Sequence, residues 1–167
     1  MLSANEIIDL LGLEPLEPEG GCFAETYRAR EQLAAAALPP RYAGARAAAT
    51  AIYYLLTATN CSRLHRLASD ELFHFYLGDP VEMLQLGPDG TGHVALLGND
   101  LRAGMRPQIL VPRGVWQGAR VRAGGALALL GTTVAPGFEL ADYECGCRDR
   151  LEAAYPEHAA LIRELMP

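Results

Sequence analysis

The stretch Cys61-Ser-Arg-Leu-His65-Arg-Leu-Ala-Ser-Asp70-Glu71-Leu-Phe-His-Phe-Tyr-Leu-Gly78 decides the predicted fold and the predicted site. It places an imidazole, His65, and a carboxylate, Glu71, on either side of the turn signal Ser69-Asp70. Because strand side chains alternate between two faces, Phe73 and Phe75 share a face with Glu71. We therefore expect two neighbouring strands that bring an imidazole, a carboxylate and aromatic rings to one wall.

Short strand-forming runs continue outward from this stretch. Turn signals such as Gly78-Asp79-Pro80 and Pro112-Arg-Gly114 separate the runs, and no helical pattern lies between them. Many short strands at near-regular spacing are typical of a β-sandwich or barrel, so the fold is predicted to be mainly β. The runs cover residues 50–57, 62–67, 72–77, 81–86, 93–97, 107–111, 115–121 and 126–134.

Both ends of the chain predict short helices. Ser3-Ala-Asn-Glu6 is a capping-box pattern that precedes an apolar stripe, and Gly12 is a stop signal. Residues 156–166 have a helical apolar pattern, whereas the Ala-rich residues 33–49 are broken by prolines and a glycine and predict a surface loop. The length predicts one domain over residues 1–167, with its barrel core at about 50–135.

Composition excludes several classes of function. The net charge is -6 and the arginines form no cluster, which argues against a nucleic-acid partner. No apolar run approaches the roughly 18 residues of a membrane span. The N-terminus lacks a signal-peptide profile, so we expect a cytoplasmic protein with reduced thiols and no membrane partner. The pair Cys145 and Cys147 is too closely spaced to indicate a zinc site by itself.

Two motifs resemble those of the cupin superfamily. From His65 to Gly78 the spacing matches the first cupin motif, although Thr59 replaces its first Gly and Leu67 replaces its second His. The second motif ends in Pro-x-Gly, two residues, His. Here Pro112-Arg-Gly114-Val-Trp-Gln117 supplies Gln117 in place of that His, and Arg106 replaces the motif's leading Gly. The resemblance implies a double-stranded β-helix, the cupin jelly roll.

A closer likeness covers most of the chain. Four segments resemble the uncharacterised Cupin 5 branch, which is similar in fold to the dTDP-sugar epimerase cupins. Glu17 stands where that branch usually has a His, so a role for that His does not transfer. The segments are Glu19-Gly-Gly-Cys-Phe-Ala-Glu-Thr-Tyr-Arg28, Ser69 to Asp79, Gln108 to Gln117 and Pro136-Gly-Phe-Glu139.

A cupin metal site uses three imidazoles and a carboxylate, so the resemblance leaves only His65, Glu71 and Gln117 as weak metal ligands. A divalent metal is therefore less expected than a metal-free pocket, because carboxamides bind transition metals poorly. His74 faces away from Glu71 unless a bulge intervenes. A buried, self-satisfied hydrogen-bonded pair of His65 and Glu71 is the structural alternative.

The leading prediction is a barrel that binds a small polar molecule, sugar-like or nucleotide-like. In the metal-free epimerases that the chain resembles, a His abstracts a proton next to a carbonyl and a Tyr returns one. The Tyr here is Tyr76, Tyr54 or Tyr143. A non-catalytic binding module and a metal-dependent dioxygenase-like cupin are the alternatives, and a homodimer is expected because exposed strand edges need protection. Candidate catalytic residues are His65, Glu71 and Tyr76; candidate ligand-binding residues are Gln117, Phe73, Phe75, Arg63, Trp116, Arg106 and Gln108.

Overall fold

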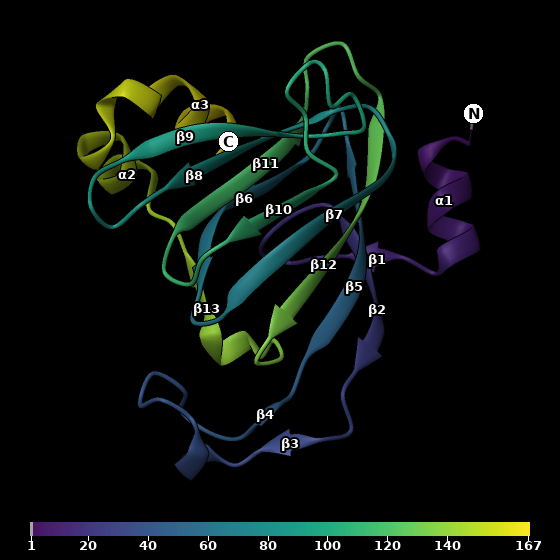
Figure 1. Ribbon diagram of the computed structural model, residues 1–167. Helices are drawn as coiled ribbons and strands as arrows, with labels where there is room; N and C mark the ends of the chain where they lie inside the picture. The colour runs from purple at the N-terminus through teal and green to yellow at the C-terminus, as the bar shows by residue number, and fades with distance from the viewer. Residues whose placement is uncertain (1) are drawn as a thin grey trace.

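The computed structural model describes residues 2–167, and its centre is a pair of facing antiparallel sheets (Figure 1). The six-stranded sheet has the order β1-β2-β5-β12-β7-β10. Its strands are β1 (Glu14–Pro15), β2 (Cys22–Arg28), β5 (Thr50–Thr57), β12 (Leu127–Ala135), β7 (Asp70–Gly78) and β10 (Gln108–Val111).

The five-stranded sheet has the order β13-β6-β11-β8-β9. Its strands are β13 (Tyr143–Cys145), β6 (Cys61–Leu67), β11 (Trp116–Val121), β8 (Val81–Leu86) and β9 (Gly92–Leu97). All eight predicted runs are strands, which confirms the mainly β fold. The alternation of side chains explains this arrangement, because each long strand has one apolar face that must be buried.

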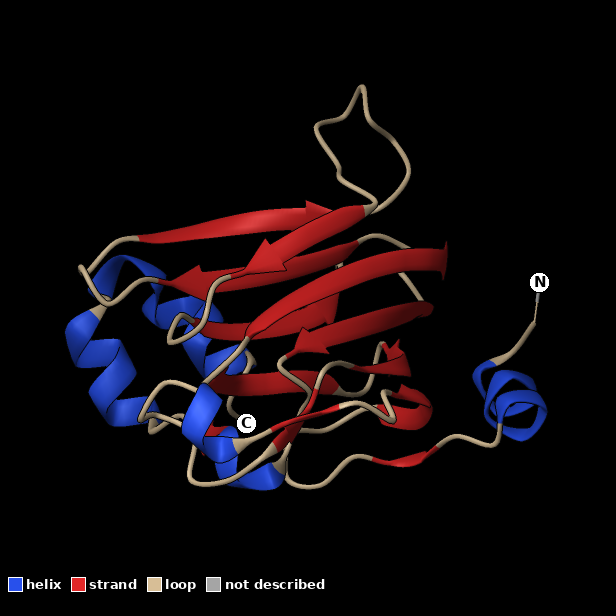
Figure 2. Ribbon diagram, turned by 60° about the horizontal axis from the view of Figure 1, so that its bottom comes forward, coloured by secondary structure: helices blue, strands red, loops and turns tan. Residues whose placement is uncertain are grey.

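The space between the sheets is the main hydrophobic core. Phe73 of β7, Met83 of β8 and Leu130 of β12 are almost completely buried there, as are Tyr54 and Leu56 of β5. Consecutive members on one strand are two residues apart, as the strand period requires. The two layers are seen edge-on in Figure 2.

Helices cover the outer faces of both sheets. Helix α1 (Ala4–Leu11) begins with the predicted Ser3–Glu6 capping box and ends at Gly12, whose φ of 63° is left-handed. It packs through Ile7 on the outer face of the six-stranded sheet. The other sheet is covered by α2 (Arg148–Ala154), η3 (Pro156–His158) and α3 (Ala159–Glu164) through Leu151 and Ile162 (Figure 2). Helix α2 has no counterpart in the sequence prediction.

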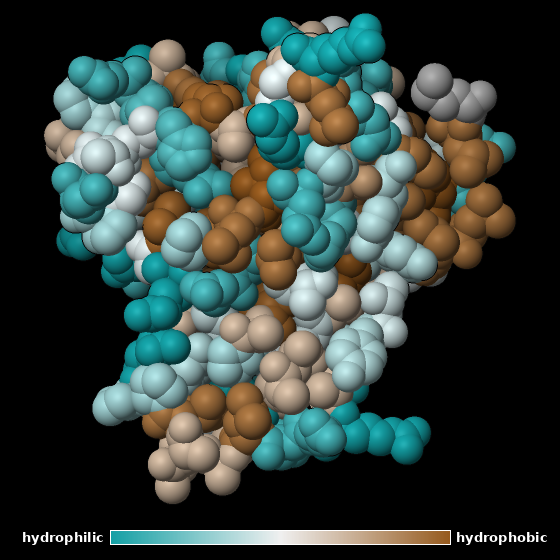
Figure 3. Space-filling model, in the orientation of Figure 1, coloured by the Kyte–Doolittle hydropathy of each residue, from teal (hydrophilic) through white to brown (hydrophobic). Residues whose placement is uncertain are grey.

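The predicted surface loop is an extended arm. It contains β3 (Gln32–Leu33), η1 (Ala35–Ala37) and β4 (Arg46–Ala47), and it projects from one end of the barrel in Figure 1. The base of the arm is fixed by Arg46, whose Nε and Nη2 each donate to Asp142 of η2 (Leu140–Asp142) at 2.7 Å. Figure 3 shows small and hydrophobic residues gathered at the tip of the arm. Between residues 2 and 167, no helix has the length and apolar character that crossing a membrane requires.

Candidate functional site

A β-bulge in β6 sets the surroundings of His65. His65 is paired with Gln117 of β11, but the next aligned pair is Ser62 with Ala119, so β6 contains one extra residue between them. The extra residue turns the Ser62 and His65 side chains inward and leaves Arg63 exposed. Arg63, a predicted ligand-binding residue, therefore reaches His65 only through its backbone oxygen, because the bulge breaks the alternation of side chains and its guanidinium faces solvent.

The hydrogen bonds of His65 define its tautomer. Its Nδ1 lies 2.8 Å from the backbone oxygen of Arg63, and a carbonyl only accepts, so Nδ1 carries the proton. The other nitrogen, Nε2, is 3.8 Å from Oε2 of Glu19. The ring stacks on Tyr143, with centroids 5.0 Å apart. In its neutral form, His65 therefore has a lone pair on Nε2 in a site that is 1% exposed.

Glu71 is a buried carboxyl with an amide partner. Gln117 Nε2 donates to Glu71 Oε2 at 2.6 Å, and Thr132, which lines the same cavity, also lowers the pKa of this carboxyl through its hydroxyl. Burial, and secondly the charge of Glu19, raise the pKa of Glu71 from 4.5 to about 7, against the opposing effects of His65 and the two hydrogen bonds. Both protonation states of Glu71 are thus populated near neutral pH.

Glu19 is a member of the site that the sequence reasoning missed. Ser62 Oγ donates to Glu19 Oε1 at 2.7 Å, and the backbone N–H of Arg63 donates to the Glu19 carbonyl at 2.8 Å. The following Gly20 has a φ of 105° and lies so close to Cys61 that a Cβ there would overlap its carbonyl oxygen. The two glycines after Glu19 are a local signal, since they allow its backbone to approach β6 closely.

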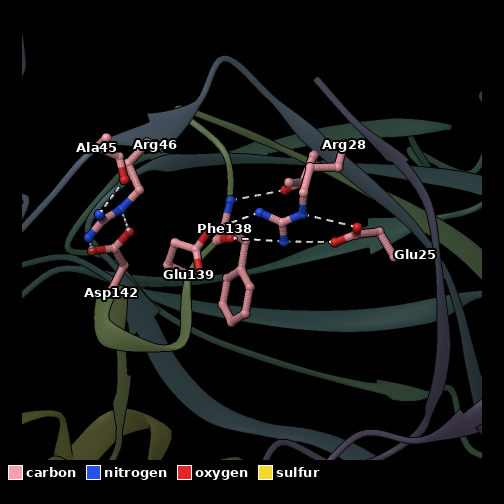
Figure 4. A network of polar contacts seen from close by, with 8 residues as sticks. Glu25, Arg28, Ala45, Arg46, Phe138, Glu139 and Asp142 are labelled. Carbon is pink, nitrogen blue, oxygen red and sulfur yellow. Dashed lines mark hydrogen bonds and ion pairs between the residues drawn. The ribbon is translucent and has the colours of Figure 1, made fainter. Parts of the chain in front are cut away.

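A cavity of about 70 Å³, here called the barrel cavity, lies beside these groups. Its polar wall contains Glu19, His65 and Glu71 together with Glu25, Thr50 and Thr132. Its apolar wall consists of Leu16, Phe23, Ala51, Ile52, Leu67, Val134 and Phe138. Arg28 links two of these lining residues, because it pairs with Glu25 on β2 and donates to the Phe138 carbonyl, and it also pairs with Glu139 (Figure 4).

Three predicted ligand-binding residues lie at or next to this site. Gln117 contacts Glu71 directly, and its Oε1 is buried without a hydrogen-bond partner in the described part of the chain. Phe73 and Phe75 face inward with Glu71, as their spacing predicts, but they pack in the hydrophobic core and do not line the cavity.

Four other predicted residues lie elsewhere. Trp116 precedes the inward-facing Gln117, so it faces outward and packs against the C-terminal helices. Tyr76 is 48% exposed beside Tyr53 on the outer face of the six-stranded sheet. Gln108 is hydrogen-bonded to His74 on that same outer face, and Arg106 lies in the 98–107 loop with its Nη1 bonded to the Met105 carbonyl.

The positions of the three candidate tyrosines show which of them contacts His65. Tyr143 stacks on His65, and its hydroxyl is buried without a partner among residues 2–167. Burial raises the pKa of this hydroxyl above its ordinary value of 10. Tyr54 donates to the Gly20 carbonyl at 2.9 Å. Tyr143 is therefore the tyrosine in contact with the imidazole, whereas Tyr76 is separated from it by the six-stranded sheet.

The residues present do not fit a cupin metal centre. Leu67 and Gln117 stand at two ligand positions, and the Gln117 amide already donates to the Glu71 carboxylate. Residues 2–167 contain no group of three or more His, Cys, Asp or Glu side chains placed to hold an ion. The chemistry of the site is therefore derived from the imidazole and the carboxyls alone.

Comparisons with known proteins agree with this architecture. A protein of Shewanella oneidensis is 36% identical, with a TM-score of 0.85 and coverage of 99% of this chain and 98% of that one. A hypothetical protein from Leishmania major is 30% identical, with a TM-score of 0.86 and coverage of 98% of both chains. Oxalate decarboxylase from Bacillus subtilis is 13% identical, with a TM-score of 0.52. The match covers 90% of this chain and 36% of the decarboxylase chain, and at this identity it shows the fold alone.

The search of curated proteins gives no match. The family model described as Cupin superfamily (DUF985) matches residues 5–146, a range that includes both sheets, the Glu19 loop and every polar residue of the barrel cavity. The predicted jelly roll is confirmed, and the chain belongs to this Cupin_5 family of the cupin superfamily.

Proposed function

We propose that the barrel cavity binds a small uncharged carbonyl compound and that His65 and Glu71 transfer protons on it, as in an isomerase or epimerase. The observation that carries the proposal is the fixed tautomer of His65. Its Nδ1–H is held by the Arg63 carbonyl at 2.8 Å, which leaves the Nε2 lone pair as a base among two carboxyls. A buried base held in one tautomer is suited to proton abstraction.

The proton transfers balance within these three groups. His65 Nε2 takes the proton from a hydroxyl-bearing carbon next to the carbonyl, and protonated Glu71 donates its proton to the carbonyl oxygen, which gives an enediol. Glu19, 3.8 Å from Nε2, stabilises the imidazolium formed in this step. The imidazolium then gives the proton to the former carbonyl carbon, and the Glu71 carboxylate takes the proton of the other enediol hydroxyl, so that a carbonyl forms at the neighbouring carbon and both groups regain their starting states. A pKa of about 7 suits Glu71 to both roles.

The charge and size of the cavity support an uncharged, small substrate. Its ionisable lining residues are Glu19, Glu25, Glu71 and His65, a set that repels an anion. A volume of about 70 Å³ is roughly twice the share that one water occupies in the liquid, about 30 Å³. A sugar-sized ligand therefore requires the cavity wall to move, and we propose that the Phe138–Glu139 segment is the part that moves outward.

Solvent-deuterium exchange tests the proposal. The protein is incubated in D₂O with a panel of small ketoses, aldoses and hydroxyketones, and exchange at the carbon next to the carbonyl is followed by NMR. We expect exchange with at least one compound, its loss in His65→Ala, and its retention in His93→Ala, which changes an exposed imidazole on the edge strand β9. Exchange that survives in His65→Ala contradicts the proposal.

The second candidate is a binding module without catalysis. It is favoured by the partners that already surround the imidazole and the carboxyl, namely the Arg63 carbonyl, Glu19 and Gln117. Saturable binding of a panel compound without exchange supports this alternative. A metal-dependent oxygenase is tested by melting curves with Mn, Fe, Ni and Zn, since a bound metal raises the melting temperature.

Self-association and location are also proposals. The outer face of the six-stranded sheet exposes Tyr76, Leu77 and Leu110, and we propose that a second copy covers it in a homodimer. Light scattering that gives a monomer contradicts this. The four cysteines are free, two of them exposed, which suits the reducing cytoplasm.

A further inference from the structure

A second hollow, of about 560 Å³, opens beside the barrel cavity and is here called the arginine hollow. Leu67 lines both spaces, and Tyr143, which stacks on His65, lines the arginine hollow. The hollow differs from the cavity in charge, because three guanidinium groups line it. Its lining residues are Arg41, Arg66, Leu67, Ala68, Arg113, Gly114, Ala141, Asp142, Tyr143 and Glu144.

The two carboxylates of the hollow are already paired. Glu144 accepts from Arg66 through both of its oxygens, at 2.7 and 2.9 Å. Asp142 accepts from Arg46 in the same two-bond manner. Within residues 2–167, neither Arg41 nor Arg113 has a carboxylate at ion-pair distance. Two positive charges in the hollow therefore lack a counter-charge from the chain.

Arg41 is held in place by neutral groups. Its Nε donates to the Ala68 carbonyl at 2.9 Å, and its guanidinium lies 4.7 Å from the centroid of the Tyr42 ring. One edge of the guanidinium is thus fixed by the protein. Its Nη2 also donates to the Tyr42 hydroxyl at 3.4 Å, so the remaining Nη N–H groups stay available for a further acceptor, since a guanidinium carries five N–H bonds.

Arg113 is presented by a tight turn. Its backbone N–H donates to Asp70 Oδ1 at 2.8 Å, and the next N–H, of Gly114, donates to the Leu67 carbonyl at 2.9 Å. Gly114 has a φ of 75°, which closes the turn. The backbone is therefore anchored while the guanidinium itself makes no hydrogen bond with the residues that the structure describes.

A second arginine-lined hollow gives a useful contrast. It has a volume of about 460 Å³ and contains Arg63, Arg120 and Arg122. There Arg120 pairs with both Glu82 and Glu164, and Arg122 lies 3.8 Å from Glu82. Most of that positive charge is thus compensated, whereas in the arginine hollow two of the three guanidiniums are not.

We propose that Arg41 and Arg113 form a binding site for a phosphate group, free or carried by a small organic molecule. Two planar forks offer enough donors for several oxygens of one tetrahedral dianion, and arginine is well suited to such recognition. The site is separate from the acidic barrel cavity, and it does not depend on the proton-transfer reaction proposed for it.

Calorimetric titration tests the site with three probes: inorganic phosphate, glycerol phosphate and malonate. We expect saturable binding of both phosphates and weaker binding of malonate. Arg113→Gln should raise the phosphate dissociation constant about tenfold, since one charge-assisted contact is lost. This variant removes no intramolecular bond of the side chain, so it should fold normally. Arg41→Lys keeps the charge but loses the fork, and it should weaken binding less.

Arg102→Gln is the matched control, because Arg102 is an exposed arginine in the 98–107 loop with no ion pair in the described chain. It should leave phosphate binding unchanged. His65→Ala should also leave it unchanged, which separates this site from the barrel cavity. Equal weakening by Arg102→Gln and Arg113→Gln, tighter binding of malonate than of phosphate, or no saturable binding at millimolar phosphate would each overturn the proposal.

Discussion

The interior of the barrel has two halves that lie on the same strands. On β11, Ala119 and Val121 face a purely apolar half, whereas Gln117 faces a polar half with His65 and Glu71. On β12, Leu130 faces the apolar half and Thr132 faces the polar half. Along one strand of the jelly roll, one inward-facing side chain can therefore belong to the hydrophobic core while the next, two residues away, belongs to the candidate site.

The two halves contribute differently to stability. The apolar half contains large side chains that are almost fully buried, among them Phe73 and Met83, and its burial drives folding. The polar half buries a carboxyl and leaves Gln117 Oε1 without a partner in the described residues. Such groups cost free energy unless they are satisfied, so we infer that packing at one end offsets polar burial at the other.

Phe73→Ala is the strongest test of the apolar half. It removes a ring that is 2% exposed, and we expect a loss of about 3–5 kcal/mol in the free energy of unfolding. Denaturant unfolding measures the loss. Tyr76→Ala, a change of a half-exposed ring on the opposite face of β7, is the control and should cost less. Equal losses in the two variants would mean that the buried ring of Phe73 contributes no more to the free energy of unfolding than the half-exposed ring of Tyr76.

Glu71→Gln tests the polar half through pH. The folded protein keeps the Glu71 proton up to about pH 7, whereas the unfolded chain releases it near 4.5. The contribution of Glu71 to the free energy of unfolding is therefore fully present below pH 4.5 and is lost as the pH rises to 7. Across this pH range, the free energy of unfolding of the wild type should fall by about 3 kcal/mol relative to that of Glu71→Gln.

Denaturant unfolding of both proteins at several pH values in that range measures the difference. Glu157→Gln, which changes an exposed carboxyl on η3, is the control and should give a flat difference. A flat difference for Glu71→Gln as well would show that Glu71 is already ionised in the folded protein above about pH 4.5, and it would remove the acid from the proposed reaction.

Thr132→Val is a smaller change in the same half. It removes a hydroxyl that stabilises the charged form of Glu71, so the pKa of Glu71 should rise further, at a cost of about 1 kcal/mol above pH 7. Carbon-13 NMR titration of the carboxyl measures the pKa. Thr133→Val changes the next residue, whose hydroxyl contacts His74, and should leave the pKa unchanged. A shift of equal size in both variants contradicts a direct contact.

The sequence predicted the strands of both halves but only part of the polar site. Alternation correctly placed Phe73 and Phe75 on the face of Glu71, because that rule depends only on local geometry. Alternation does not hold at Arg63, whose side chain is exposed, because a bulge in β6 adds one residue that no composition signal marks. Trp116 was misplaced for a simpler reason, since alternation beside an inward-facing Gln117 requires it to face outward.

Residues that join the site through distant contacts were the hardest to predict. Glu19 meets Ser62 across 43 residues of sequence, and Tyr143 reaches His65 only because β13 pairs with β6. Neither contact follows from local spacing. Helix α2 was missed because it has seven residues and one buried side chain, Leu151, so its apolar pattern is weak.

Arg28→Ala should have the smallest effect on stability and a clear effect on access to the polar half. Arg28 joins Glu25, a lining residue of the cavity, to Glu139, with side chains that are 38% to 46% exposed, so its loss should cost less than about 1 kcal/mol. It also donates to the carbonyl of Phe138, whose ring lines the cavity. Without these contacts the segment should open more often, and diethyl pyrocarbonate should modify His65 faster, as measured by mass spectrometry.

Arg163→Ala removes another exposed arginine fork, to Glu152 on α2, and should leave that rate unchanged. An unchanged rate in Arg28→Ala would mean that the ligand enters the barrel by a route other than the Phe138–Glu139 segment.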